Sequence, residues 1–149
     1  MKKLALFVLV LFAAVEIHAQ SYEYKIVTSI ESVVPMGLGR SRIISAQEEK
    51  DYTTYTTSRT EENTKQNKSK RSEAKVDDFD ETKILNFYSA TGINFQNVAS
   101  NDALISSKVN KMTDEGWELT FVTSGVESDA GKGDGTGIFI TRFIFRRQK

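Results

Sequence analysis

The sequence predicts a small α+β fold, in which an antiparallel sheet of the split β-α-β type carries one main helix on one face. Three observations support this prediction: an amphipathic stretch that ends at a glycine, a strand-like alternation near the start, and a C-terminal run that is apolar on both faces. The chain has 149 residues, enough for one domain, and a long polar insertion interrupts the predicted elements.

The first 19 residues have the layout of a secretory signal peptide. Residues 1–3 are a short basic start, residues 4–15 are an unbroken apolar run, and Ala19 is a small residue at the expected cleavage position. The apolar run is too short to span a bilayer, although an uncleaved anchor is the alternative. We therefore expect residues 20–149 to form one exported bacterial domain, periplasmic or secreted, with no membrane contact after the signal is removed.

The first predicted strand covers residues 22–30. Tyr22, Tyr24 and Ile26 share one parity and Glu23 and Lys25 the other, so we expect the aromatic and aliphatic side chains to face the core. Pro35 in the following turn cannot donate to a strand ladder. The loop after it contains Arg40 and Arg42, which are candidates for an anion site; the alternative is an exposed turn.

Residues 46–78 form the polar insertion, which has almost no large aliphatic residue before Val76. Ordering a chain costs roughly 1–2 kcal/mol of conformational entropy per residue, and a segment this polar cannot offset that cost by burial. We therefore expect the insertion to be mobile. Its basic cluster is Lys65, Lys68, Lys70, Arg71 and Lys75. Acidic residues flank this cluster, which favours a self-neutralising loop over a nucleic-acid site. Apolar residues return within 84–95, where the pattern predicts either a strand-turn-strand or an irregular lid.

One amphipathic helix is predicted between residue 100 and Gly116, capped by Ser100 or Asn101. Its predicted apolar face consists of Leu104, Ile105, Val109 and Met112, with Lys108 on the same face. The alternation from Trp117 to Thr123 predicts a half-buried strand. A glycine-rich loop, residues 125–137, follows; its Glu127, Asp129 and Asp134 are candidate calcium ligands, and the alternative is a plain hairpin loop.

The C-terminal run, residues 138–147, is apolar on both sides. Phe139, Phe143 and Phe145 share one face, and Ile138, Ile140 and Ile144 share the other. Such a strand should be central, with the helix on one face, in the spatial order first, last, middle. The second face then needs cover from residues 84–95 or from another subunit, which predicts a homo-oligomer or a protein partner on that face.

Residues 22–27 read YEYKIV, residues 115–119 read EGWEL, and residues 143–146 read FIFR. These three motifs resemble those of a small bacterial domain family of unknown function. Members of that family open with YEYKVV, carry an EGWEL helix exit and end on a similar strand, but the compact form lacks the polar insertion. The resemblance implies the fold and transfers no activity, cofactor or site residue.

The composition of the exported part limits its chemistry. The chain has no cysteine, and its single histidine, His18, lies in the signal. The usual general base near neutral pH, the soft zinc ligands and a thiol nucleophile are therefore missing. Without the signal the chain has 18 basic and 19 acidic residues, a balance that does not favour nucleic acid or an anionic membrane as partner.

We therefore expect a non-catalytic domain that binds a protein or a cell-surface component, with no cofactor and no catalytic or metal-binding residue. A small anion- or calcium-binding module is the first alternative. A hydrolase that uses only carboxylates is the second. Its candidate carboxylates are Asp77, Asp78, Asp80, Glu81, Asp114, Glu115 and Glu118.

Overall fold

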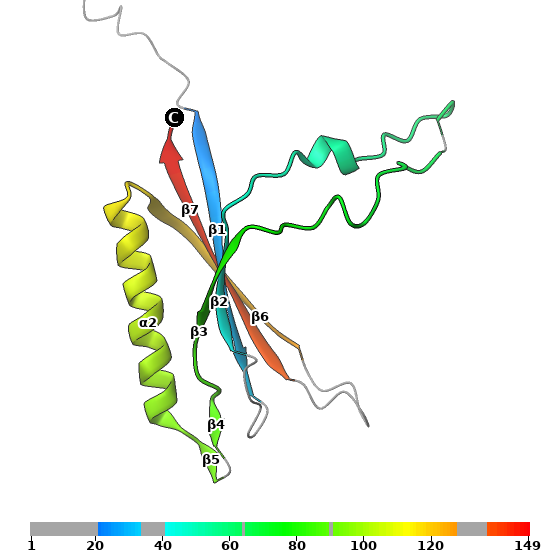
Figure 1. Ribbon diagram of the computed structural model, residues 1–149. Helices are drawn as coiled ribbons and strands as arrows, with labels where there is room; N and C mark the ends of the chain where they lie inside the picture. Colours follow the sequence, from blue (N-terminus) through cyan, green and yellow to red (C-terminus); the bar gives the residue numbers. More distant parts are fainter. Residues whose placement is uncertain (1–20, 34–40, 64, 90, 128–136) are drawn as a thin grey trace, which may run out of the picture.

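The structure is a computed structural model that describes residues 21–33, 41–63, 65–89, 91–127 and 137–149. The predicted signal peptide lies outside these residues. The fold is α+β, as the sequence predicts: a five-stranded antiparallel sheet with one main helix packed against it, and a small two-stranded sheet (Figure 1).

The elements follow one another as β1 (Tyr22–Ser32), β2 (Arg42–Ala46), the 3-10 helix η1 (Tyr52–Tyr55), β3 (Phe79–Lys83), β4 (Tyr88–Ser89), β5 (Gly92–Ile93), α2 (Phe95–Asp114), β6 (Glu118–Glu127) and β7 (Ile138–Gln148). The large sheet has the order β3-β2-β1-β7-β6, with β7 antiparallel to both β1 and β6. The prediction that the last strand lies between the first and the middle one is confirmed. β3, formed by the polar run Phe79–Lys83, was not predicted.

Helix α2 begins earlier than predicted. Its N-cap is Asn94, whose side-chain oxygen accepts hydrogen bonds from the backbone N–H groups of Gln96 and Asn97. The predicted caps at Ser100 and Asn101 are wrong: both residues lie inside the helix, and Asn101 is fully buried. The first turn was missed because the segment from Phe95 to Ser100 has no clear apolar stripe; its Phe95 is 78% exposed.

The end of α2 is as predicted. Gly116 has φ +85°, which an L side chain rarely adopts. The Gly116 N–H donates to the Thr113 carbonyl at 2.9 Å and the Trp117 N–H donates to the Met112 carbonyl at 3.0 Å. These two bonds are those of a Schellman motif, which satisfies carbonyls that the helix end would leave unpaired.

The core lies between α2 and one face of the sheet. Its buried apolar residues are Val27, Ile43, Ile84, Met112, Trp117 and Phe145, and Ile105, Val109 and Phe143 pack against them. Trp117 is therefore a core residue, as expected. Leu104, placed on the apolar face of the helix by the sequence pattern, is instead 39% exposed.

The predicted orientation of β1 is wrong. Val27 and Ser29 point to the helix and are fully buried, whereas Tyr24 and Ile26 lie on the opposite face with 61% and 49% of their surface exposed. The reason is the pairing register: Val27 is opposite Phe143 of β7, and Phe143 belongs to the face that α2 covers. The alternation identified the two faces correctly but could not say which of them the helix covers.

The polar insertion forms a long arm between β2 and β3 that projects away from α2 (Figure 1). We call residues 47–78 the arm. The Gln47 N–H donates to the Asp78 carbonyl at 3.0 Å and closes the base of the arm. None of its described residues is buried. The predicted mobility of the segment stays a prediction.

Residues 84–95 contain the predicted strand-turn-strand, in the form of β4 and β5, but they do not cover the second face of the sheet. The ring of Phe87 packs edge-on against Phe139, with centroids 5.7 Å apart, and Phe139 lies on the same face as Phe143 and Phe145. This segment therefore extends the helix-side layer. The possibility that it covers the other face is wrong.

Candidate functional site

The face of the large sheet that points away from α2 is the principal candidate site, and we call it the outer face. The strand registers define its members, because residues directly opposite each other in a ladder share a face. From β1 and β7 these are Tyr22, Tyr24, Ile26, Thr28, Ile30, Ile138, Ile140, Arg142, Ile144 and Arg146. From β6 they include Glu118, Phe121 and Thr123, and from β2 and β3 Arg42, Ile44, Ala46, Phe79, Glu81 and Lys83.

One row of the outer face is apolar across all five strands. Ile26 is opposite Ile144, and Ile144 is opposite Phe121. On the other side Ala46, which follows the last β2 residue paired with β1, is opposite Phe79. The exposed fractions are 65% for Phe121, 49% for Ile26 and 45% for Phe79. We call Phe79, Ala46, Ile26, Ile144 and Phe121 the apolar row.

A β-bulge places Phe121 in this row. The register shifts between Leu119 and Phe121, so that Thr120 is an extra residue in β6. A regular alternation from Trp117 would put Leu119 and Phe121 on the same face. Because of the bulge, Leu119 is opposite Phe145 on the helix side while Phe121 is opposite Ile144 on the outer face.

Ion pairs border the apolar row on both sides. The Arg146 Nε donates to the Glu118 carboxylate at 2.8 Å, and its guanidinium carbon lies 4.7 Å from the centre of the Tyr22 ring. The hydrogen bond from Arg146 lowers the pKa of Glu118. On the other side Arg42 pairs with Glu81. An apolar centre with a charged rim is the usual anatomy of a protein interface.

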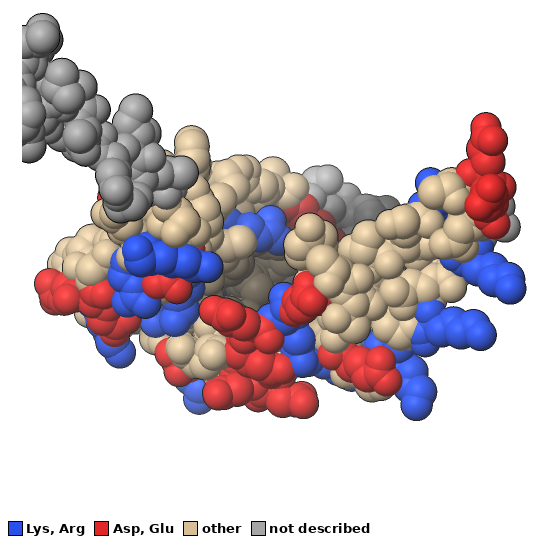
Figure 2. All heavy atoms as spheres, turned by 90° about the horizontal axis from the view of Figure 1, so that it is seen from above, with Lys and Arg blue, Asp and Glu red and all other residues tan. Residues whose placement is uncertain are grey.

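A second feature is a cleft of about 450 Å³ at the edge of the sheet, which we call the arm cleft. It is lined by Glu23–Ile26 of β1, by Ala46–Lys50 at the root of the arm, and by Trp117 and Arg147. Seen from the end of the molecule at which the C-terminus lies, the surface is hollowed between the body of the domain and the arm, with acidic and basic side chains beside the hollow (Figure 2).

The charged groups of the arm cleft are unequally paired. Arg147 donates to Glu23 at 2.7 Å, and Lys50 pairs with Glu48, which lowers the pKa of the Glu48 carboxyl. The Lys25 ammonium donates to the neutral Gln47 side chain at 3.2 Å. Among the residues that the structure describes, no carboxylate forms an ion pair with Lys25 and no cation forms one with Glu49.

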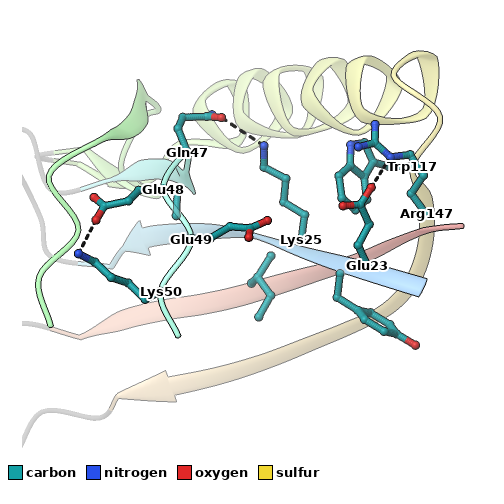
Figure 3. Close-up of a pocket in the computed structure, with 11 residues that line it drawn as sticks. Glu23, Lys25, Gln47, Glu48, Glu49, Lys50, Trp117 and Arg147 are labelled. Atoms are coloured by element: carbon teal, nitrogen blue, oxygen red, sulfur yellow. Dashed lines mark hydrogen bonds and ion pairs between the residues drawn. The ribbon is translucent and has the colours of Figure 1, made fainter. Parts of the chain in front are cut away.

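Figure 3 shows how these side chains lie. Lys25 from β1 and Glu49 from the arm root both reach into the space between the strand and the arm. Trp117, with Arg147 over its ring, closes one end of this space. Besides its paired charges, the arm cleft therefore contains one cation, Lys25, and one anion, Glu49, that form no ion pair, with the Trp117–Arg147 stack at one end.

The candidate ligand groups of the sequence are not brought together. Arg42 is paired with Glu81, and Arg40 lies outside the described residues. In the glycine-rich loop Glu127 is the last residue of β6, whereas Asp129 and Asp134 lie outside the described part. Within the described ranges no group of three or more His, Cys, Asp or Glu side chains could hold a metal ion.

The candidate carboxylates are distributed over separate elements. Asp77 and Asp78 belong to the arm, Asp80 and Glu81 to β3, Asp114 and Glu115 to the end of α2, and Glu118 to β6. Four of them are paired with cations: Asp80 with Lys108, Glu81 with Arg42, Glu115 with Lys111, and Glu118 with Arg146. Neither the apolar row nor the arm cleft was predicted as such. The row could have been found only with the register of β6, which depends on the bulge.

Comparison with known protein families, with characterised proteins and with solved structures finds no significant match. The resemblance to the bacterial family of unknown function thus stays a prediction. Among the described residues no helix is long and apolar enough to cross a membrane.

Proposed function

We propose that this protein is an exported, non-catalytic docking module that binds another protein molecule through the outer face of its sheet. The observation that carries this proposal is the apolar row, in which Ile26, Phe79 and Phe121 are each at least 45% exposed. Aligned on one face, these side chains form a contiguous apolar surface of the kind that marks interaction sites.

The rim of the outer face supports the same proposal. Arg146 and Tyr22 stack beside the apolar row, and Arg and Tyr are enriched in the residues that dominate binding energy at protein interfaces. The Arg146–Glu118 and Arg42–Glu81 pairs are partly exposed, and they can select a partner of matching charge. The non-catalytic part of the proposal is supported by the lack of cysteine, and of histidine after residue 18.

Site-specific photo-crosslinking tests the proposal. A photoreactive phenylalanine analogue at position 121, introduced into the full chain in the organism that encodes it, should give a covalent adduct with a protein on illumination. The matched control is position 95, where Phe95 is 78% exposed but belongs to α2 and not to the outer face.

An adduct at position 121 without one at position 95 supports the proposal, and its mass shows whether the partner is a second copy or another protein. The absence of any adduct at position 121, or equal adducts at both positions, would overturn it. Sedimentation of the purified protein provides an independent measurement, since a second copy as partner predicts a dimer that Phe121→Gln dissociates and Phe95→Gln does not.

A further inference from the structure

The arm cleft lies beside the part of β1 that is not paired with β2. β1 pairs with β7 over its whole length, from Tyr22 to Ser32, but its pairing with β2 covers only Val27 to Ile30. Beyond Ala46 the chain leaves the sheet and enters the arm (Figure 1). The first part of β1 therefore has a strand on one side and the arm cleft on the other.

Backbone hydrogen bonds fix which groups of β1 point into the arm cleft. The Lys149 N–H donates to the Ser21 carbonyl and the Val33 N–H donates to the Gly137 carbonyl, both at 3.0 Å. The backbone N–H and C=O groups of the odd-numbered residues of β1 thus point toward β7, and those of the even-numbered residues point to the opposite edge of the strand. The N–H and C=O of Tyr24 are directed toward the arm cleft, where no strand of the described chain pairs with them.

The side chains around this edge form two walls. On the helix side are Glu23 and Lys25, with the Trp117–Arg147 pair behind them. On the outer side are Tyr24 and Ile26, which are 61% and 49% exposed. A strand placed along this edge would alternate its side chains between the two walls, so that every second residue meets Lys25 or its neighbours.

We infer that the arm cleft binds an extended peptide segment, which adds to the sheet as a short strand beside Tyr24. The cleft volume of about 450 Å³ is within the range of ligand sites. Backbone hydrogen bonds to Tyr24 supply the sequence-independent part of recognition, and the flanking side chains supply selectivity, as in other cases of strand addition.

The charges of the arm cleft define the peptide. Lys25 attracts a carboxylate on the helix side, and Glu49 attracts a cation at the arm root. The outer wall accepts aliphatic side chains. The segment that fits best alternates aliphatic residues with one acidic and one basic residue. This site lies beside the outer face, with which it shares Tyr24, Ile26 and Ala46, but it binds through the free edge of β1 and not through the face.

A blocked pentapeptide with the order Val-Glu-Val-Lys-Val is the probe, titrated into the isotope-labelled exported domain and followed by NMR. We expect saturable shifts of the backbone amides of residues 22–26 and 46–50. Lys25→Glu should weaken binding at least tenfold, while the control Lys68→Glu, an exposed lysine of the arm, should leave affinity unchanged. A peptide with lysine in place of the glutamate should bind the Lys25→Glu variant better than the unchanged protein.

A peptide with N-methyl groups on the residues whose N–H groups would point toward Tyr24 provides the backbone control, because it keeps the side chains but cannot complete the ladder. Loss of binding by this peptide, together with charge rescue at position 25, supports strand addition. The inference is overturned if the probe does not bind at millimolar concentration, if the methylated peptide binds equally well, or if the shifts map elsewhere. A mere loss of folding in the Lys25→Glu variant cannot give the charge rescue. Photo-crosslinking at position 121 does not involve this cleft, so the two proposals fail independently.

Discussion

The guanidinium carbon of Arg147 lies 4.4 Å from the centre of the Trp117 ring. The same guanidinium donates to the Glu23 carboxylate at 2.7 Å and to the Glu115 carbonyl at 3.2 Å. Arg147 therefore connects β1, the end of α2 and the tryptophan that follows it. Trp117 itself is 8% exposed and belongs to the core, so this corner fixes the helix on the sheet.

Replacement of Trp117 by alanine should remove this anchor. We expect Trp117→Ala to lower the free energy of unfolding by about 3–5 kcal/mol, because a large buried side chain is replaced by a cavity. Chemical denaturation followed by circular dichroism measures the change. The control Phe95→Ala removes an aromatic side chain that is 78% exposed and should change stability by less than about 0.5 kcal/mol. A loss below 1 kcal/mol in Trp117→Ala would show that the tryptophan is not a core anchor.

The end of α2, with Gly116 and Trp117, was the part of the fold that could best be predicted from sequence. Helical spacing, a glycine at the helix end and a tryptophan after it are local signals in the sequence. The structure they predict is also local, because the Schellman bonds of Gly116 and Trp117 join residues only three to five positions apart. The central place of β7 was also predictable, because a strand with phenylalanine on one face and isoleucine on the other needs neighbours on both edges.

The outer face could not be predicted in the same way, because it depends on relations between strands. The alternation in β1 shows that Tyr24 and Ile26 share a face, but their exposure follows from the register with β7. In β6 the bulge at Thr120 moves the Phe121 side chain to the outer face, and the residue types around Thr120 do not predict a bulge. In β3, the polar residues become a strand through backbone pairing with β2 rather than through their own burial.

Gly116 should resist substitution for a purely conformational reason. Its φ is +85°, and a Cβ there would meet only Arg147 at 3.7 Å, an ordinary contact. Gly116→Ala should therefore cost about 1–2 kcal/mol, the usual cost of the left-handed conformation for an L residue. Gly125 on β6 has open space around its Cα and no positive φ, so Gly125→Ala should be neutral or slightly stabilising. Equal urea midpoints for the two variants would contradict this account.

Asn101 should be the most sensitive polar residue of α2. Its side chain is fully buried, accepts from the Leu85 N–H at 2.7 Å and donates to the Leu85 carbonyl at 2.7 Å. Asn101→Ala leaves both backbone groups without their partner, at a cost of about 1–3 kcal/mol for each group that water cannot reach. Asn110→Ala, at an exposed position of the same helix, should change the unfolding free energy by less than about 0.5 kcal/mol. Similar losses of unfolding free energy in both variants would contradict the prediction.

The arm should be the first part of the folded chain to be cleaved by a protease. Its described residues contribute nothing to the buried core, and local opening there costs little. Brief treatment with trypsin should cut first after Lys65, Lys68, Lys70 or Arg71, leaving the two fragments associated through the sheet. Mass spectrometry of the early products identifies the sites. First cleavage after Lys108 or Lys111 of α2 would show that the helix opens before the arm.

Glu31 should make the stability depend on pH in the opposite direction to the paired carboxylates. Burial raises its pKa, while the hydrogen bond from the Asn101 side chain opposes that effect and nearby Asp102 adds to it. With a folded pKa above the unfolded value, the folded state holds this proton more tightly. The contribution of Glu31 to stability is therefore fully present below the unfolded pKa and is lost as pH rises through the folded pKa.

Glu31→Gln removes this titration and keeps an oxygen that can accept from Asn101. The difference in unfolding free energy, variant minus unchanged protein, should increase as pH rises from below about 4 toward neutrality and then level off. Glu118→Gln is the matched comparison: the Arg146 hydrogen bond lowers the pKa of Glu118, so the same difference should fall with rising pH. Urea denaturation at several pH values measures both. A pH-independent difference for Glu31→Gln would mean that the carboxyl is hydrated in the folded state as it is in the unfolded chain.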